Sequence, residues 1–317
     1  MSGGSIPREK RGMRVTMKKD HQKLEKLLNE LYEDHSSSAL QSLTEKIFRL
    51  DPENPEALLF LADHTEDPEE ALSYLSRGVT RLRSLLGELP ENQGGDLQAL
   101  LFEALQRMGW YYILEDRGEE AVALSEELLA LPQEDYSWAK AIHYVGLILT
   151  EQYSRVLERV IAEEDPDVFS AHVKAMALLE YSHSSRESTI ALWDAFRLDP
   201  NLPFYLLDFW VPPLDGEDDE EDLESYSRAL LLEPAWTLTE PRITALSTAA
   251  VFFGYITERI PDHLLEDITE ELHQNPIFAF LEMAREKVAE YLEDTEDFHQ
   301  ADMMALDILS SMDNLLP

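Results

Sequence analysis

One helix ending recurs along this chain and constrains its fold more than any other feature. Four segments finish an apolar stretch with leucine and then enter a turn that contains proline. They are KIFRLDPENP (Lys46–Pro55), ELLALPQED (Glu127–Asp135), DAFRLDPNLP (Asp194–Pro203) and RALLLEPAW (Arg228–Trp236). Because proline cannot continue a helix, we expect each helix to stop at its turn. Repetition of one helix–turn unit predicts a stack of helix pairs, each burying its apolar face on its neighbours.

The residues between these turns have helical periodicity. Apolar residues recur three and four positions apart, for example at Ile277, Leu281, Ala284, Val288 and Tyr291. That spacing places them on one helix face, and no stretch alternates with a period of two over the length of a strand. The sequence therefore predicts an all-α protein that is helical from about residue 20.

Within the helical region, a set of large and small residues keeps a fixed spacing. It is most complete in residues 102–135, where the matching positions are Leu105, Met108, Gly109, Tyr112, Ala121, Leu131 and Pro132. Residues 169–202 keep the spacing at Ala175, Leu192, Ala195, Leu198 and Pro200, and the stretch near residue 55 keeps it at Leu58, Leu61, Ala62, Ala71 and Leu75. Residues 136–168 match less well, and Tyr226, Ala229, Leu232 and Pro234 mark a second helix alone. Small residues at such positions let paired helices approach closely.

This pattern resembles the tetratricopeptide repeat over about residues 36–236. The resemblance implies a right-handed α-solenoid of helix pairs. A second resemblance lies in DPNLPFYLLDFWVPP (Asp199–Pro213) and ESYSRALLLEPAWTLTEP (Glu224–Pro241). Those segments are similar to the suppressor-of-tumorigenicity-seven proteins and their bacterial relatives, which implies a helical repeat scaffold without a defined activity.

Composition shifts divide the chain into four parts. Residues 1–19 are basic and lack apolar periodicity, so we expect a disordered arm. Residues 20–214 form the predicted repeats, and residues 215–222, with seven acids in eight positions, form a predicted acidic linker loop. Residues 223–317 are expected to contain the last repeat helix and a C-terminal helical cap, with helices at 243–258, 262–273, 277–293 and 299–312.

The charge balance bears on the partners of this chain. It has 64 acids and 26 Lys and Arg, a formal net charge of −38. Such a chain repels phosphate backbones and anionic membranes and attracts basic proteins, so we expect no nucleic-acid or membrane partner. It lacks cysteine, and its longest uncharged apolar stretch, Ile243–Thr257, is shorter than the roughly 20 residues of a membrane-spanning helix. With no segment resembling a signal peptide, a cytoplasmic location is expected.

The motif most suggestive of an enzyme is Glu-x-x-His. It occurs at Glu180/His183, Glu270/His273 and Glu296/His299. Such pairs hold two metal ions in some helical bundles, but acids are so abundant here that about two are expected by chance from composition. No phosphate-binding glycine loop, His-Glu-x-x-His motif or nucleophile elbow accompanies them. We therefore expect no catalysis and no cofactor.

The tetratricopeptide resemblance points instead to the concave face formed by the first helices. Carrying the inner positions across gives the expected partner-binding residues Glu103, Gln106, Trp110, Lys140, Tyr144 and Val173. Trp110 and Tyr144 are candidate aromatic anchors for a peptide or partner protein, or else they pack between repeats. Two other functions stay open: a self-assembling structural subunit, and an enzyme with a helical metal or acid–base site in residues 243–317. The oligomeric state is open.

Overall fold

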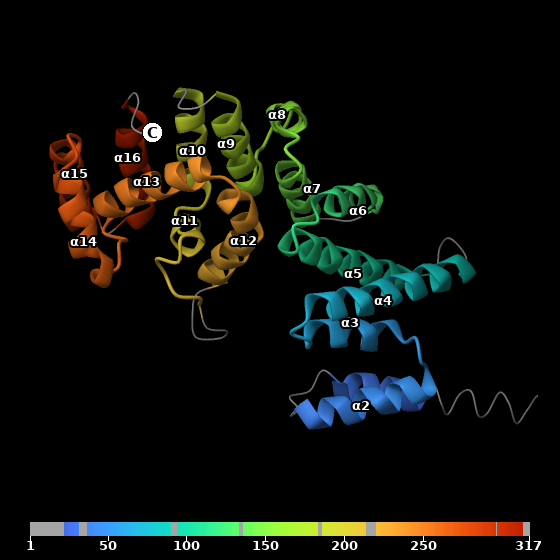
Figure 1. The fold of residues 1–317 in the computed structure, drawn as a ribbon. Helices are drawn as coiled ribbons and strands as arrows, with labels where there is room; N and C mark the ends of the chain where they lie inside the picture. Colours follow the sequence, from blue (N-terminus) through green and yellow to red (C-terminus); the bar gives the residue numbers. More distant parts are fainter. Residues whose placement is uncertain are drawn as a thin grey trace, which may run out of the picture. The chain divides into compact units, whose positions relative to one another are not determined.

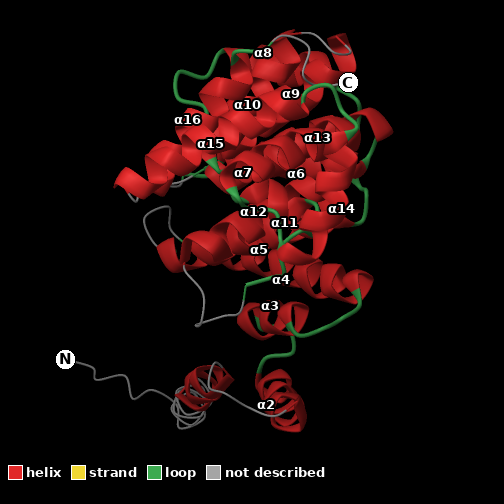
Figure 2. Cartoon of the chain, turned by 90° about the vertical axis from the view of Figure 1, so that its left-hand side faces the viewer, coloured by secondary structure: helices red, strands yellow, loops and turns green. Residues whose placement is uncertain are grey.

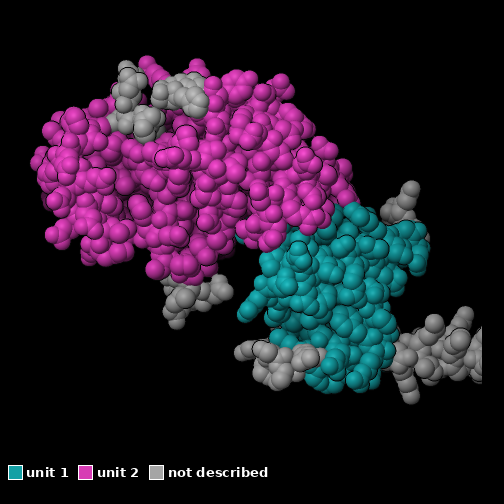
Figure 3. All heavy atoms as spheres, in the orientation of Figure 1, with its two compact units in different colours: residues 1–111 teal, residues 112–317 magenta. Residues whose placement is uncertain are grey.

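Helices make up the regular structure of the described chain, which confirms the all-α prediction (Figures 1 and 2). The computed structural model describes residues 22–31, 37–89, 94–132, 136–182, 186–213, 220–295 and 297–312, and no strand occurs in these ranges. The predicted arm at residues 1–19 lies outside them. The chain divides into two compact units, residues 1–111 and 112–317 (Figure 3).

The first unit begins with a helix over residues 22–31. It continues with α2 (Ser37–Leu50), α3 (Pro55–Asp63), α4 (Pro68–Glu88) and most of α5 (Gly95–Leu114). Asn54 caps α3 by accepting the Ala57 N–H at 3.0 Å, and Asp67 caps α4. Pro55 and Pro68 each occupy the first helical position, where a missing N–H is harmless. These caps fix where both helices of the pair begin.

A glycine allows close packing of the α3/α4 pair. Gly78 of α4 is buried, and a Cβ there would lie 2.7 Å from Leu59 Cδ1 and 3.7 Å from Leu58 Cβ. Any side chain at Gly78 would push the helices apart. A short turn joins the helices, and the middle of α4 meets the start of α3, so the pair is antiparallel.

The second unit contains the remaining helices. In order they are α6 (Gly118–Ala130), α7 (Ser137–Leu149), α8 (Tyr153–Ile161), α9 (Val168–Ser182), α10 (Arg186–Leu198), α11 (Leu202–Leu206), α12 (Glu220–Thr237), α13 (Glu240–Thr257), α14 (Asp262–His273), α15 (Phe278–Thr295) and α16 (Phe298–Ser310). Consecutive helices from α6 to α10 pack on one another. The four predicted C-terminal helices correspond to α13, α14, α15 and α16.

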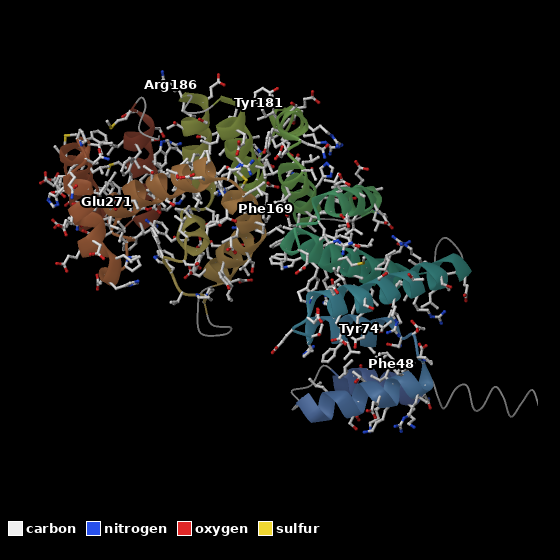
Figure 4. The ribbon with its side chains drawn as sticks, in the orientation of Figure 1. Phe48, Tyr74, Phe169, Tyr181, Arg186 and Glu271 are labelled. Carbon is white, nitrogen blue, oxygen red and sulfur yellow. The ribbon has the colours of Figure 1, made fainter. Side chains whose placement is uncertain are left out.

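Two glycines face each other where α6 meets α7. A Cβ on Gly146 would lie 3.1 Å from the Gly118 carbonyl oxygen, and a Cβ on Gly118 would lie 3.1 Å from the Gly146 oxygen. Gly118 begins α6 and Gly146 is near the end of α7, so this pair is also antiparallel. Ser154, near the start of α8, contacts Tyr181, near the end of α9, which gives the same orientation there (Figure 4).

Three of the four predicted helix endings are confirmed. The helices α2, α6 and α10 end at Leu50, Ala130 and Leu198, each two residues before its proline. The fourth is wrong, because α12 continues through Pro234 to Thr237. A proline inside a helix costs about 3 kcal/mol. The fully buried Trp236 side chain, two residues further on, contributes about 3–5 kcal/mol, so tertiary packing outweighs the break.

Part of the predicted acidic loop is helical. Glu220, Glu221 and Asp222 form the first turn of α12, and residues 215–219 lie outside the described ranges. Carboxylates are favourable in a first helical turn because the exposed N–H groups there carry partial positive charge. The run therefore serves in part as the start of a helix.

The helices after α11 fold back over earlier ones. Within the second unit, α12 packs on both α7 and α9, and α13 packs on α9 and α10. The Trp236 indole N–H of α12 donates to Nδ1 of His172 on α9 at 3.2 Å, and both residues are fully buried. In a simple repeat stack each unit contacts only its neighbours. Here α12 packs on α7 and α9, which lie earlier in the chain and are not its sequence neighbours.

Arg242 anchors the start of α13 in this packed region. Its side chain is fully buried and donates to the Ala235 carbonyl and the Tyr153 hydroxyl, both at 2.8 Å. Its Nε lies 2.8 Å from Glu180 Oε1, although the N–H is not aligned on that oxygen. Thr239 donates to the same oxygen at 2.7 Å. A buried guanidinium needs such partners, because an unpaired buried charge is costly.

The stretch Ile243–Thr257 forms most of α13, and many of its residues are buried, as expected. Among the described residues, no helix has both the length and the apolar character needed to cross a membrane.

Candidate functional site

The six predicted partner-binding residues fall in different units. Glu103, Gln106 and Trp110 lie on α5 in the first unit. The other three lie in the second unit, with Lys140 and Tyr144 on α7 and Val173 on α9. The predicted surface therefore consists of an α5 half in the first unit and an α7 half, with Val173 of α9, in the second unit.

The α5 half keeps some solvent exposure. Glu103 is exposed, and Gln106 and Trp110 are half-buried. Arg107 lies between two carboxylates: its guanidinium pairs with Glu103 and lies 2.7 Å from Asp63 Oδ2 on α3. Burial raises the pKa of Asp63, and Arg107 opposes that rise. The ion pairs fix one turn of α5 next to α3, and the face with Trp110 remains partly accessible.

The α7 half is a polar cluster around Glu163, which lies in the loop before α9. The Tyr144 hydroxyl and the Ser170 hydroxyl donate to its two carboxylate oxygens, the latter at 2.6 Å. Lys140 Nζ lies 3.4 Å from Glu163 Oε1 and 3.2 Å from Asp167 Oδ2. Asp167 also caps α9 by accepting the Ser170 N–H at 2.8 Å. The cluster thus ties α7 to the start of α9.

The pKa values of this cluster agree with a structural role. Burial and the neighbouring Glu163 carboxylate raise the pKa of Tyr144 above its ordinary value, so its hydroxyl stays protonated and donates. Burial alone would lower the pKa of Lys140, but Asp167 and Glu163 outweigh burial and raise it. Lys140 is therefore a paired cation rather than one that is free for a ligand.

Val173 and Tyr144 are placed differently from the expectation that they face a partner. Val173 is 0% exposed and Tyr144 is 5% exposed. The physical reason is that α7 and α9 pack on each other and on α8 and α12, and α9 also packs on α10 and α13, so little of either helix faces solvent. In this conformation Val173 is a core residue, and Tyr144 reaches Glu163 rather than solvent.

A serine and a histidine meet inside the second unit, but not as a nucleophile and base. Ser125 Oγ lies 2.9 Å from His143 Nδ1, and both residues are 0% exposed. The serine hydroxyl donates to the Val122 carbonyl at 2.8 Å, so its single hydrogen is used and His143 must donate to it. Burial and the nearby Arg159 lower the pKa of His143 to about 4, which keeps the ring neutral. This pair joins α6 to α7.

The Glu-x-x-His pairs do not assemble a metal site in the described part of the chain. No group of three or more His, Asp or Glu residues there has a geometry that could hold a metal. Of the three pairs, Glu270/His273 lies wholly inside the described ranges, whereas His183 and Glu296 lie outside them. The His273 ring packs on Phe278 at 4.0 Å, and its Nδ1 lies 2.7 Å from the Thr269 carbonyl oxygen.

A cleft of about 420 Å³ opens near α11 in the second unit. We call it the aromatic–proline cleft, because aromatic rings and prolines dominate its lining: Tyr205, Phe209, Trp210, Val211, Pro212, Pro213, Asp222, Pro261 and His263. These residues come from α11, the segment after it, the start of α12, and the turn into α14. On sequence alone, the stretch FYLLDFWVPP carries a resemblance and no predicted contact residue, although its density of aromatic residues and prolines is a signal that could have indicated the cleft.

Two other clefts are more polar or smaller. One in the first unit, of about 400 Å³, is lined by hydroxyls, Arg77, Arg81 and Glu53. Arg77 is already paired with Glu53 at 3.1 Å. The other, of about 250 Å³, lies between α13 and α14 in the second unit and includes Phe252 and Glu271, the latter labelled in Figure 4. The first of these contains no aromatic ring and the second contains one, whereas the aromatic–proline cleft is lined by three aromatic rings and three prolines.

The chain matches no protein-family model, no curated protein and no solved structure. The tetratricopeptide resemblance therefore stays a prediction from the residue pattern.

Proposed function

We propose that this chain is a tetratricopeptide-like helical-repeat protein that binds a peptide or partner protein. The observation that carries the proposal is the antiparallel packing of consecutive helices through small residues. The small residues matched to the repeat, Ala71, Ala121, Ala175, Ala195 and Ala229, are all at most 2% exposed. Buried small residues at these positions are what a stack of helix pairs requires.

The proposed contact surface is the exposed face of α5. Because α12 and α13 pack on α7 and α9, a partner meets less of those first helices than in an open repeat array. Trp110 is the large aromatic among the predicted contact residues that is neither fully nor nearly fully buried. Trp is enriched at binding hot spots, since burying its large ring away from water contributes much favourable free energy to binding.

The charge of the chain favours a basic partner. A formal net charge of −38 raises the local concentration of cationic proteins and speeds their association at low ionic strength. This attraction is long-range and unspecific, so the partner's identity depends on the contacts at the surface. A test must therefore separate specific binding from attraction of any basic protein.

The test begins with capture of partners by the immobilised full chain from cells of its own source. A captured protein is then produced separately, and its affinity is measured by calorimetry at two salt concentrations. We expect saturable binding that persists at the higher salt, while an unrelated basic protein is released. Binding that disappears for both proteins would reduce the interaction to charge alone and would contradict the proposal.

Trp110→Ala tests the surface, with Trp236→Ala as its control. Loss of a hot-spot aromatic should weaken partner binding by about 2 kcal/mol, roughly 30-fold. Because Trp110 is half-buried, we expect the free energy of unfolding to fall by about 1–2 kcal/mol, against about 3–5 kcal/mol for the fully buried Trp236. Unchanged affinity in a folded Trp110→Ala protein would remove α5 from the surface. A mass that rises with concentration and no separate partner would favour self-assembly.

A further inference from the structure

The indole of Trp210 is held rigidly at the wall of the aromatic–proline cleft. One ring face stacks on the fully buried Phe204, with centroids 5.1 Å apart and planes 19° from parallel. The indole N–H donates to the Arg259 carbonyl at 3.0 Å. Asp208, with φ 55°, turns the chain after α11, and the Phe209 and Trp210 N–H groups both donate to the Phe204 carbonyl. A ring fixed in this way loses little entropy when a ligand binds.

The second wall is built around Tyr205. Its ring is perpendicular to Trp210, at 87° with centroids 5.4 Å apart. Tyr205 is 8% exposed, so its ring supports the Trp210 indole more than it faces solvent. Val211, next to Trp210 in the chain, is 83% exposed, and Pro212 and Pro261 extend the apolar lining. A fixed indole and prolines form a stiff apolar surface, which suits an extended apolar segment.

The charge around the cleft is negative. Asp222 contributes a carboxylate to the lining, and Glu220 and Glu221 share its helical turn. The nearby arginines are already paired, Arg228 with Asp199 and Glu224, and Arg259 with Asp302. They cannot neutralise the rim, so a ligand with basic side chains complements it.

We propose that the aromatic–proline cleft binds an extended, proline-containing segment of a partner protein that carries lysine or arginine beside its prolines. Proline-rich segments adopt the polyproline II conformation before binding and dock in grooves lined by aromatic rings. Trp210 and the exposed Val211 receive a proline ring, and the Asp222 side of the cleft receives the basic side chain. This inference rests on the proposed interaction function and names the chemistry of the partner.

The probe is a fluorescent peptide of Pro-Pro-Arg repeats, titrated with the full chain and followed by anisotropy. Peptides of Ala-Ala-Arg and Pro-Pro-Glu repeats serve as comparisons for charge alone and proline alone. We expect Pro-Pro-Arg to bind at least about tenfold more tightly than either. Equal affinity for Ala-Ala-Arg would show that charge alone binds the peptide, and equal affinity for Pro-Pro-Glu would show that the rim charge is irrelevant. Either result overturns the proposal.

Val211→Arg locates the binding site without disturbing the fold. Its side chain is almost fully exposed, so the substitution adds bulk and positive charge at the cleft and breaks little packing. We expect affinity for Pro-Pro-Arg to fall by at least about tenfold. Ile161→Arg, at a 71% exposed residue of α8, makes the same change of charge outside the cleft lining and should leave affinity nearly unchanged. Equal effects of the two substitutions would place the peptide elsewhere.

Asp222→Asn separates charge from shape. The amide keeps the size of the carboxylate and an oxygen that can accept the Asn201 N–H, which Asp222 now accepts at 3.2 Å. We expect a several-fold loss of affinity at low salt that shrinks at high salt, where charges are screened. An affinity equal to that of the unchanged chain at low salt would contradict the assigned role of Asp222.

Other occupants of the cleft are outcomes of the same experiment. Tighter binding of a peptide of residues 1–19 than of Pro-Pro-Arg, lost in Val211→Arg, would assign the cleft to the chain's own basic arm. A concentration-dependent mass lost in Val211→Arg would assign it to a second copy. Both overturn the proposal. Failure of the proline peptide, with intact Trp110-dependent partner binding, would reject this inference and leave the proposed function standing.

Discussion

The string FRLDP occurs twice in this chain, once in each unit. The two copies end a helix in the same way but differ in the residues that surround them. Both finish a helix, α2 at Leu50 and α10 at Leu198, before the same Asp-Pro turn. Phe48 of the first copy is half-buried, whereas Phe196 of the second is 0% exposed. Local sequence therefore sets where the helix stops, and the surrounding helices set how much each side chain contributes to stability.

The difference comes from the C-terminal helices of the second unit. Phe196 packs edge-on against Phe253 of α13, with ring centroids 5.9 Å apart. Its neighbour Arg197 reaches α16, where it donates to Asp307 Oδ1 at 2.8 Å. In the first copy, the one ion pair of Arg49 among the described residues is within its own helix, with Glu45 at 3.5 Å. Identical residues thus have local roles in one unit and long-range roles in the other.

The largest contrast is expected for the two phenylalanines. Phe196→Ala should lower the free energy of unfolding of the second unit by about 3–5 kcal/mol, because it leaves a cavity among buried rings. Phe48→Ala should cost the first unit about 1–2 kcal/mol, since its side chain is already partly in water. Denaturant unfolding followed by hydrogen exchange of each unit measures both values. Equal losses would mean that the described burial does not determine stability.

The next largest contrast in unfolding free energy is expected for the aspartates of the two FRLDP strings, Asp51 and Asp199. Asp199 is 3% exposed and accepts from the Leu202 N–H, the Ser225 hydroxyl and Arg228. Asp199→Ala leaves these donors unpaired and should cost about 3 kcal/mol. Asp51 is half-buried, so Asp51→Ala should lower the free energy of unfolding by under about 1 kcal/mol. A thermal melt of each variant checks the order, and a larger loss for Asp51→Ala would reverse the comparison.

The buried histidines make the second unit sensitive to acid. Burial lowers the pKa of His143 to about 4 and that of His172 to about 3, below the ordinary value of about 6.5. Each contributes stability that is full above pH 6.5 and is lost as pH falls toward the folded pKa. For His143 the loss at pH 5 is about 2 kcal/mol.

The control for this pH dependence is His143→Gln, which has no titrating ring. Unfolding free energies of both proteins are measured from pH 8 to pH 5. The variant should show a flatter pH dependence, whatever its stability at pH 8. Parallel curves would show that His143 titrates at the same pH in the folded and unfolded chain.

The smallest contrast concerns the two arginines. Arg197→Ala removes bonds to Asp194, Asp307 and Ser310 from a side chain that is 25% exposed, and should cost about 1 kcal/mol. The Arg49 side chain is 77% exposed, so Arg49→Ala should lower the free energy of unfolding by about 0.3 kcal/mol or less. Added salt should narrow this gap. A gap that does not change with salt would assign it to packing of the arginine stem.

Helix positions could be predicted from sequence because their signals are local. The endings at Leu50, Ala130 and Leu198 follow from nearby prolines, and α14 has the predicted bounds. The continuation of α12 through Pro234 could not be predicted, because it depends on the burial of Trp236 beside His172, 64 residues earlier. Long-range packing overrides local propensity at such places.

The candidate sites also differ in how far local sequence predicts them: spacing within one helix can be predicted, and contacts between distant segments cannot. Lys140 and Tyr144 lie on one helix at helical spacing, which the sequence alone indicates, but their partner Glu163 lies in a loop whose position no spacing rule gives. The aromatic–proline cleft brings Trp210 together with Pro261, which are far apart in sequence and belong to different turns. A motif resemblance singled out FYLLDFWVPP, and only the fold shows that three of its rings line a cleft.

The covering of α9 by α12 has a consequence for synthesis on the ribosome. His172 is made 64 residues before Trp236. At about 5–20 residues per second, Trp236 is synthesised about 3–13 s after His172. The apolar side of α9 stays uncovered by α12 for that time, which is far longer than the microseconds a helix needs to form. During that interval the nascent chain presents a formed but uncovered helix face. This interval is when the protein is most exposed to aggregation and most in need of a chaperone.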